Sequence, residues 1–251
     1  MTFEHPINIH TPEKLLNQIR GQSVFKQEIL QQLNSQVYLM LKKKNVLQSI
    51  SDLTFLDEIH HAQKDLIRRA AFISPKLVFV SEKIKSLCHL KYEHSDGRID
   101  PCGGIKKNYL ACSPYSPNES EIKKQLDSSD LICFLQADNL TDMKQQKYLH
   151  EILFEVENYL RRMGILVVMS FGAGPCRMCE QCAGELHEEC YAPVKRRFSL
   201  ESCGIDVGWA MEAVALITGN EVWKLIWLKD FGLKSEDKES FKSVMGIMLR
   251  V

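Results

Sequence analysis

The sequence predicts a mixed α/β fold, in which a helical amino-terminal region (residues 1–75) precedes an α/β domain (residues 76–251) with a mainly parallel sheet. Three observations favour this fold class. Apolar residues recur at helical spacing before residue 73, short apolar runs alternate with a long helical pattern after it, and a cysteine-rich loop, residues 171–207, follows one of these runs. An α+β arrangement is the alternative that this pattern leaves open.

Helices are predicted through most of the amino-terminal region. Thr11-Pro12-Glu13 suits a helix start, because threonine caps a first turn well and proline is tolerated at the first helical position. Two further series place an apolar residue at nearly every fourth position: Phe25, Ile29, Leu33, Val37 and Leu41, and then Phe55, Ile59, Ala62, Leu66 and Ala70. We therefore expect roughly three helices before the first strand.

Strands and helices alternate in the rest of the chain. Lys76–Val80 predicts a short strand, and the stretch 93–119, rich in Gly, Pro and Ser, predicts an irregular loop. Leu131–Leu135 and Ile165–Phe171 predict buried strands, and Asp142–Met163 between them has helical spacing. A strand, a helix and a strand with short links are typical of a parallel crossover, so a mainly parallel sheet is expected.

The last third of the chain predicts a helix at Val207–Ile217 and a closing strand at Val244–Val251. The segment Gly172–Pro175 ends the preceding strand directly before Cys176. The cysteine-rich loop therefore begins at the carboxyl end of a strand, where open α/β sheets commonly place their ligands.

Charge and hydropathy exclude several classes of protein. The 32 Lys and Arg residues balance the 32 Asp and Glu residues, so no net charge draws the molecule to nucleic acid or to an anionic membrane. The amino terminus lacks the apolar stretch of a secretory signal, and every apolar segment is far shorter than the ~20 residues that span a bilayer. We expect a soluble cytoplasmic protein, in which the 9 cysteines are free or metal-bound and do not form disulfides.

Four of the cysteines are spaced as metal ligands. Cys176, Cys179 and Cys182 form a C-x2-C-x2-C run, and Cys190 follows after seven intervening residues. Three thiolates at this spacing can wrap one face of an iron–sulfur cubane, and a more distant fourth cysteine closes the cage. The spacing therefore favours a [4Fe–4S] cluster bound by these four residues.

Zinc is the alternative metal. Four thiolates also form a tetrahedral structural zinc site, usually as two separate C-x2-C pairs. Here Cys179 belongs to both pairs, which suits a cluster better than a single zinc ion.

The segments Phe171–Cys176 and Arg197–Val207, with the cysteines between them, resemble the signature of a bacterial and archaeal family of predicted metal-binding proteins. The resemblance is specific over residues 171–207 and extends more weakly back to about residue 88, where Cys112-Ser113-Pro114 is similar to an upstream motif of the family. It implies metal binding by the four cysteines named above and suggests a second site that includes Cys102 and Cys112. The family usually has a pair of cysteines before that upstream motif, whereas this chain has Cys102 followed by two glycines, and Cys88 is the remaining candidate for a third ligand.

Charged residues near the loop have two interpretations each. Lys195-Arg196-Arg197 could hold an anionic substrate, the carboxylates of a redox partner or the negative charge of the cluster itself, or could be a solvated turn. Glu201 and Asp206 are expected to cap the helix that follows them.

Three further candidates are weaker as functional residues. Glu58 and His61 have the spacing of half a di-iron motif, but its second copy is absent, so an exposed or capping histidine is favoured. Cys133 lies in an apolar strand and is predicted to be a core residue. Cys203 lies outside the ligand spacing. It is expected either to pack beside the site or to be a spare thiol.

Two principal functions follow from the cysteine motif. The first is a redox or cluster-dependent enzyme component, which uses electron transfer or an open iron and acts with a redox partner or a small anionic substrate. The second is a zinc module that only folds the loop for interaction with a partner, and a metal or cluster carrier is a further alternative. The sequence specifies neither a reaction nor a substrate.

Overall fold

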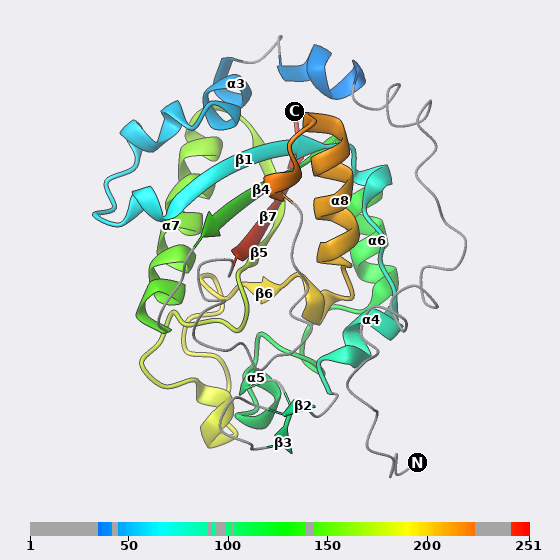
Figure 1. Ribbon diagram of the computed structural model, residues 1–251. Helices are drawn as coiled ribbons and strands as arrows, with labels where there is room; N and C mark the ends of the chain where they lie inside the picture. Colours follow the sequence, from blue (N-terminus) through cyan, green and yellow to red (C-terminus); the bar gives the residue numbers. More distant parts are fainter. Residues whose placement is uncertain are drawn as a thin grey trace.

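A five-stranded sheet forms the centre of the molecule in the computed structural model (Figure 1). The structure describes residues 35–41, 45–89, 92–93, 99–101, 103–138, 143–223 and 242–251. In spatial order the strands are β1 (Ile67–Ile73), β4 (Leu131–Asp138), β7 (Lys242–Arg250), β5 (Leu166–Gly172) and β6 (Phe198–Ser199). A separate two-stranded ladder joins β2 (Tyr92–Glu93) to β3 (Ile99–Asp100).

The mixed α/β class is confirmed, but the prediction of a mainly parallel sheet is wrong. β7 lies between β4 and β5 and is antiparallel to both, and β1 is antiparallel to β4. β4 and β5 therefore run in the same direction, as a crossover requires, without being neighbours. The only parallel pair among the described strands is β5 with β6.

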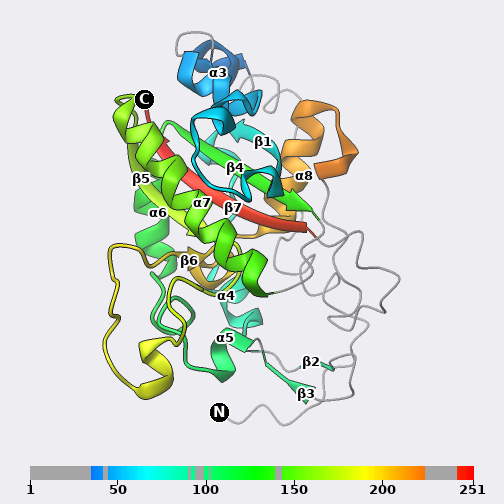
Figure 2. The same ribbon diagram turned by 90° about the vertical axis from the view of Figure 1, so that its left-hand side faces the viewer.

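Helices cover both faces of the sheet (Figures 1 and 2). They are α3 (Asn45–Ser51), α4 (Glu82–Leu87), α5 (Gly103–Lys106), α6 (Glu119–Asp127), α7 (Met143–Arg162) and α8 (Val207–Thr218). Short 3-10 helices span Thr54–Glu58, Lys64–Leu66, Pro75–Leu77, Ala183–Leu186, Glu201–Cys203 and Glu221–Trp223. α7 and α3 pack on one face and α8 and α6 on the other, which makes a three-layer molecule.

The buried strand β4 explains how these layers are held together. Ile132 and Phe134 point into the core beneath α8, whereas Leu131, Cys133 and Leu135 point into the core beneath α7. Successive side chains in a strand alternate between faces, so a continuous apolar run is expected when helices cover both. The predicted strand and its partner helix, α7, are both confirmed.

The boundary between the helical and strand regions was predicted incorrectly. Ile67–Ile73, expected to be helical, forms β1 and pairs with β4, because a short apolar run can match either period and here both of its faces are covered. Lys76–Val80, expected to be a strand, begins as a 3-10 helix at Pro75, and Val80 makes only an isolated bridge to Ile205.

Other predicted elements have mixed outcomes. Residues 35–41 are helical, as expected, whereas the predicted helix start at Thr11 and residues 25–33 lie outside the described residues. The later helices and strands expected at Ile165–Phe171, Val207–Ile217 and Val244–Val251 correspond to β5, α8 and β7. Among the described helices, none is long and apolar enough to cross a membrane.

Candidate metal site

The cysteine loop, residues 173–197, connects two neighbouring strands of the sheet. It leaves the carboxyl end of β5 and returns as β6, with Phe171 paired to Phe198 and Gly172 paired to Ser199. Ala183–Leu186, a 3-10 helix, is the loop's regular element within the described residues. Because the sheet fixes both ends of the loop, its four cysteines are confined to one end of the molecule (Figure 2).

The four predicted ligands lie on one loop, and three of them act electrostatically on the fourth, Cys179. All four thiols are free and partly buried. Burial raises the pKa of Cys179 above its ordinary value, and Cys176, Cys190 and Cys182 raise this pKa further, while Lys147 of α7 lowers it. Each of the other three thiols is therefore close enough to Cys179 to act on its charge.

The four thiols are farther apart than the ligands of a bound metal ion. Among the described residues, no three His, Cys, Asp or Glu side chains converge closely enough to hold a metal ion. Binding a metal would therefore have to draw the four thiols closer together, which an irregular loop allows more readily than a helix or a strand.

The upstream loop, residues 103–118, folds against the cysteine loop. The side-chain amide of Asn108 donates to the carbonyl of Gly184 over 2.8 Å. A Cβ atom on Gly184 would lie 2.0 Å from the backbone oxygen of Asn108, so only glycine permits this approach. The two loops are thus in backbone contact beside Cys182.

Tyr109 forms a second link between the loops. Nη1 of Arg177 donates to its hydroxyl over 2.6 Å, and the guanidinium carbon lies 5.0 Å from the centre of its ring. Burial raises the pKa of Tyr109, Arg177 lowers it, and the nearby Glu185 and Cys182 raise it. The upstream loop therefore covers the cysteine loop with a buried phenol and holds the side chain of Arg177, the residue that follows Cys176.

The upstream cysteines are only partly described. Cys112 is buried, and its sulfur leaves no room for a side chain at Gly104, which also faces Pro175. Cys102 lies outside the described residues, and Cys88 is partly buried at the end of α4. A second metal site at Cys102 and Cys112 therefore stays a prediction.

The family of predicted metal-binding proteins designated DUF2284 matches residues 71–220, which include the end of β1, both loops and α8. The chain belongs to this family. Neither the curated proteins nor the solved structures include a match to the chain.

In this DUF2284 member, unpaired polar atoms lie at the start of the cysteine loop. Both ring nitrogens of His150 and Nε of Arg177 are buried without a hydrogen bond of ordinary geometry. Burial lowers the pKa of His150 to about 4, the backbone of Ala173 opposes this shift, and the charges of Arg197 and Arg177 add to it. The backbone of Ala173 and Pro175 is close enough to the imidazole to act on its pKa, so His150 lies directly against the start of the cysteine loop.

These residues fit the group that the family description and the spacing imply. Thiolates are the preferred donors for iron–sulfur clusters and also bind zinc. A four-thiolate metal centre is anionic, and Arg177 and Lys147 supply positive charge next to the thiols. The donor type, the number of donors and the surrounding charge are therefore all suitable for a metal centre.

The sequence did not predict the buried ion pair that anchors the end of the cysteine loop. Arg197 contacts both carboxylate oxygens of Glu157, which also accepts a hydrogen bond from Ser170 over 2.5 Å. Arg197 is buried in this ion pair, so neither interpretation of residues 195–197, anion binding or a solvated turn, describes this residue. Lys195 is exposed and Arg196 is partly exposed, so these two remain accessible. Glutamate and arginine are common surface residues, and no local pattern marked Glu157 and Arg197 as a pair.

The remaining cysteine candidates outside the two loops belong to the core. Burial raises the pKa of Cys133 in β4 far above its ordinary value, as expected for a core thiol. Burial also raises the pKa of Cys203 to about 12, which makes it a packed residue rather than a reactive spare thiol.

The acidic and histidine candidates have structural roles. Asp206 caps α8 by accepting from the amide of Trp209 over 2.9 Å, as predicted. Glu201 is half-buried, and burial raises its pKa. His61 is partly buried rather than exposed. It pairs with Glu151 of α7 over 3.1 Å, and its Nδ1 accepts from the amide of Gln63, which precedes the short helix Lys64–Leu66.

Proposed function

We propose that this protein is an iron–sulfur protein, in which Cys176, Cys179, Cys182 and Cys190 hold one [4Fe–4S] cluster. The supporting observation is that three of the thiols act electrostatically on the fourth, Cys179, the residue shared by both C-x2-C pairs. A centrally placed thiol between two others suits a cubane, in which each cysteine binds a different iron, better than it suits a single zinc ion.

With this cluster, the protein would act as a redox component or as a component of a cluster-dependent enzyme. When bound, such a cluster supplies one-electron transfer, or Lewis acidity if one iron is left open. The chain's own residues hold the thiolates on a loop anchored at both ends, and Tyr109 and Asn108 cover one side of it. A redox partner or a small anionic substrate would then meet the accessible side of the loop.

The fourth ligand separates these two roles. If Cys190 binds iron, the cluster is closed and electron transfer is favoured. Cys190→Ser should then lower the iron content and alter the electron paramagnetic resonance spectrum of the reduced protein. An unchanged spectrum would indicate an open iron and a Lewis-acid role.

Metal analysis tests the proposal as a whole. Protein made with ample iron and purified without oxygen should be brown, absorb broadly near ~400 nm and hold about four irons and four acid-labile sulfides per chain. A colourless protein with a single zinc ion would contradict it and favour the zinc interaction module. Iron that is lost on dialysis would instead favour a protein that carries and delivers metal or clusters.

The proposed second site has its own test. If Cys102 and Cys112 help to hold a second cluster, the double variant Cys102→Ser, Cys112→Ser should lose about half of the iron. Unchanged iron with faster bleaching in air would instead assign the upstream loop to protecting the first cluster.

A further inference from the structure

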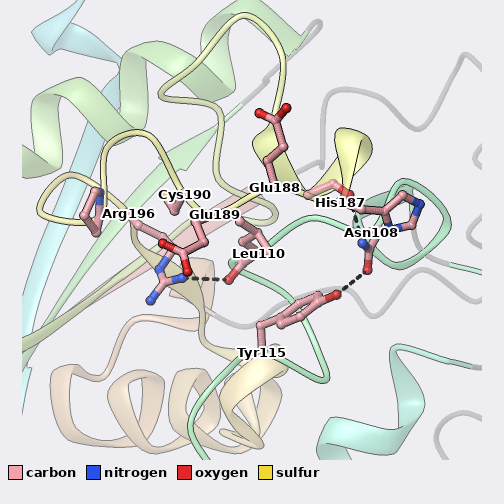
Figure 3. A pocket seen from close by; sticks show the side chains of 10 residues that line it. Asn108, Leu110, Tyr115, His187, Glu188, Glu189, Cys190 and Arg196 are labelled. Atoms are coloured by element: carbon pink, nitrogen blue, oxygen red, sulfur yellow. Dashed lines mark hydrogen bonds between the residues drawn. The ribbon is translucent and has the colours of Figure 1, made fainter.

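A pocket of about 590 Å³ opens between the upstream loop and the cysteine loop (Figure 3). Its volume falls within the ~300–1,000 Å³ that is usual for small-molecule sites. Asn108 and Tyr115 line it from the upstream loop, and Glu189, Cys190 and Arg196 line it from the cysteine loop. Of the four proposed metal ligands, Cys190 is the one that reaches this pocket.

Arg196 gives the pocket a fixed positive charge. Its Nη1 donates to the carbonyl of Leu110 over 3.5 Å, and its guanidinium carbon lies 4.9 Å from the centre of the Phe198 ring. Within the described part of the chain, no carboxylate lies within ion-pair distance of it. Most of its N–H groups therefore remain available for a carboxylate, which a guanidinium binds at two points.

Glu189 gives the same pocket a negative charge. Its side chain is exposed, and no ion pair with a described cation holds it. The neighbouring carboxylate of Glu188 instead accepts a hydrogen bond from the hydroxyl of Tyr191 and points away from Arg196 in Figure 3. One open carboxylate and one open guanidinium therefore face a single pocket.

Two neutral groups complete the wall opposite the cysteine loop. The hydroxyl of Tyr115 donates to Oδ1 of Asn108 over 2.9 Å, and Asn108 is itself held by Gly184. Because these groups are already paired with each other, they shape the pocket without adding charge. Charge selection therefore depends on the side chains of the lining that can carry charge, which are Arg196, Glu189, Glu188 and His187.

We propose that this pocket binds a small zwitterion, with its carboxylate on Arg196 and its ammonium group toward Glu189, next to Cys190. Each charge of such a ligand meets the opposite charge of the protein, so neither remains desolvated without a partner. The inference deepens the proposed function, because it places a substrate of this class beside the cysteine whose role as fourth ligand is in question.

Calorimetric titration of the anaerobically purified, metal-loaded protein tests the proposal. The probes are 4-aminobutyrate, which has both charges, and butyrate and butylammonium, which each have one. We expect 4-aminobutyrate to bind at least about tenfold more tightly than either analogue, since each lacks one charge-assisted hydrogen bond. Butyrate binding as tightly as 4-aminobutyrate would overturn the role of Glu189, and absence of binding by all three probes would overturn the pocket.

Matched variants locate the binding. Arg196→Gln and Glu189→Gln should each weaken 4-aminobutyrate binding by about tenfold. Arg162→Gln and Glu180→Gln remove the same charges from exposed positions outside the pocket. These two variants should bind 4-aminobutyrate as tightly as the wild type does. Arg196→Lys is the control for misfolding. It keeps the positive charge, so it should recover part of the affinity that Arg196→Gln loses. Equal affinity in the wild type and in Arg196→Gln would overturn the proposal.

The outcome is separable from that of the metal assignment. A colourless protein that binds 4-aminobutyrate through Arg196 would refute the cluster and support the pocket. A brown protein with its full iron content and no binding would support the cluster and refute the pocket.

Discussion

The guanidinium of Arg197 donates two hydrogen bonds to the carboxylate of Glu157, with Nε 2.6 Å from Oε1 and Nη2 2.5 Å from Oε2. Arg197 lies at the end of the cysteine loop and Glu157 lies within α7. Arg197 also donates to the carbonyls of Val194 and Arg196. The ion pair therefore ties the returning end of the loop to the helix that packs behind it.

Glu157→Gln should lower the free energy of unfolding by about 3 kcal/mol, because it leaves the Arg197 guanidinium buried without a counter-charge. Arg161→Gln is the matched control. Arg161 contacts the same carboxylate, but 47% of its side chain is exposed, against 10% for Arg197. Its removal should cost less than about 1 kcal/mol. Urea unfolding measures both, and equal losses would contradict the view that burial makes the Arg197 pair the stronger one.

Loss of any ligand from the C-x2-C-x2-C run should abolish metal loading. Cys176→Ser, Cys179→Ser and Cys182→Ser should each leave little iron, because all three cysteines of this run bind the cluster whether or not Cys190 is the fourth ligand. They should also unfold at lower urea concentration, since metal binding adds to folding free energy. Cys133→Ala, which removes a thiol from the core of β4, should keep its iron. Equal iron loss in all four variants would indicate general unfolding and would remove the support for these ligands.

Gly172→Ala should destabilise the protein through His150. A Cβ atom at position 172 would lie 2.1 Å from Cε1 of the imidazole, which is buried and cannot move aside easily. We expect a loss of about 2 kcal/mol, typical of overpacking. In the His150→Ala background the same methyl group enters vacated space, so a double-mutant cycle should give a large favourable coupling. Additive effects would show that the imidazole does not enforce glycine at this position.

The buried imidazole of His150 should make stability depend on pH. Burial lowers its pKa from 6.5 to about 4, so the unfolded chain takes up a proton at a higher pH than the folded chain does. The stability is fully present above the unfolded pKa of 6.5 and is lost progressively as the pH falls toward 4, by up to about 1.4 kcal/mol per pH unit. His150→Gln should flatten urea-unfolding free energies between pH 7 and pH 5, relative to the wild type. An equally steep decline in the variant would assign the pH dependence to other groups.

The sequence by itself determined the local features of this protein. Apolar runs predicted β4, β5 and β7, because buried strands must be apolar on both faces, and helical spacing predicted α7 and α8. The cysteine spacing selected the four candidate ligands and the chemistry that they share. The attachment of the cysteine loop to the end of β5 also followed from glycines and a proline that end a strand.

Only the tertiary structure decided which of these pieces meet. Insertion of β7 between β4 and β5 made the sheet mostly antiparallel, and pairing with β4 made a strand of residues 67–73. The pairing of Glu157 with Arg197 and the contact of Asn108 with Gly184 were likewise invisible in the sequence. The physical reason is range: periodicity, capping and ligand spacing act over a few residues, whereas strand order and contacts between loops depend on how distant segments share one core.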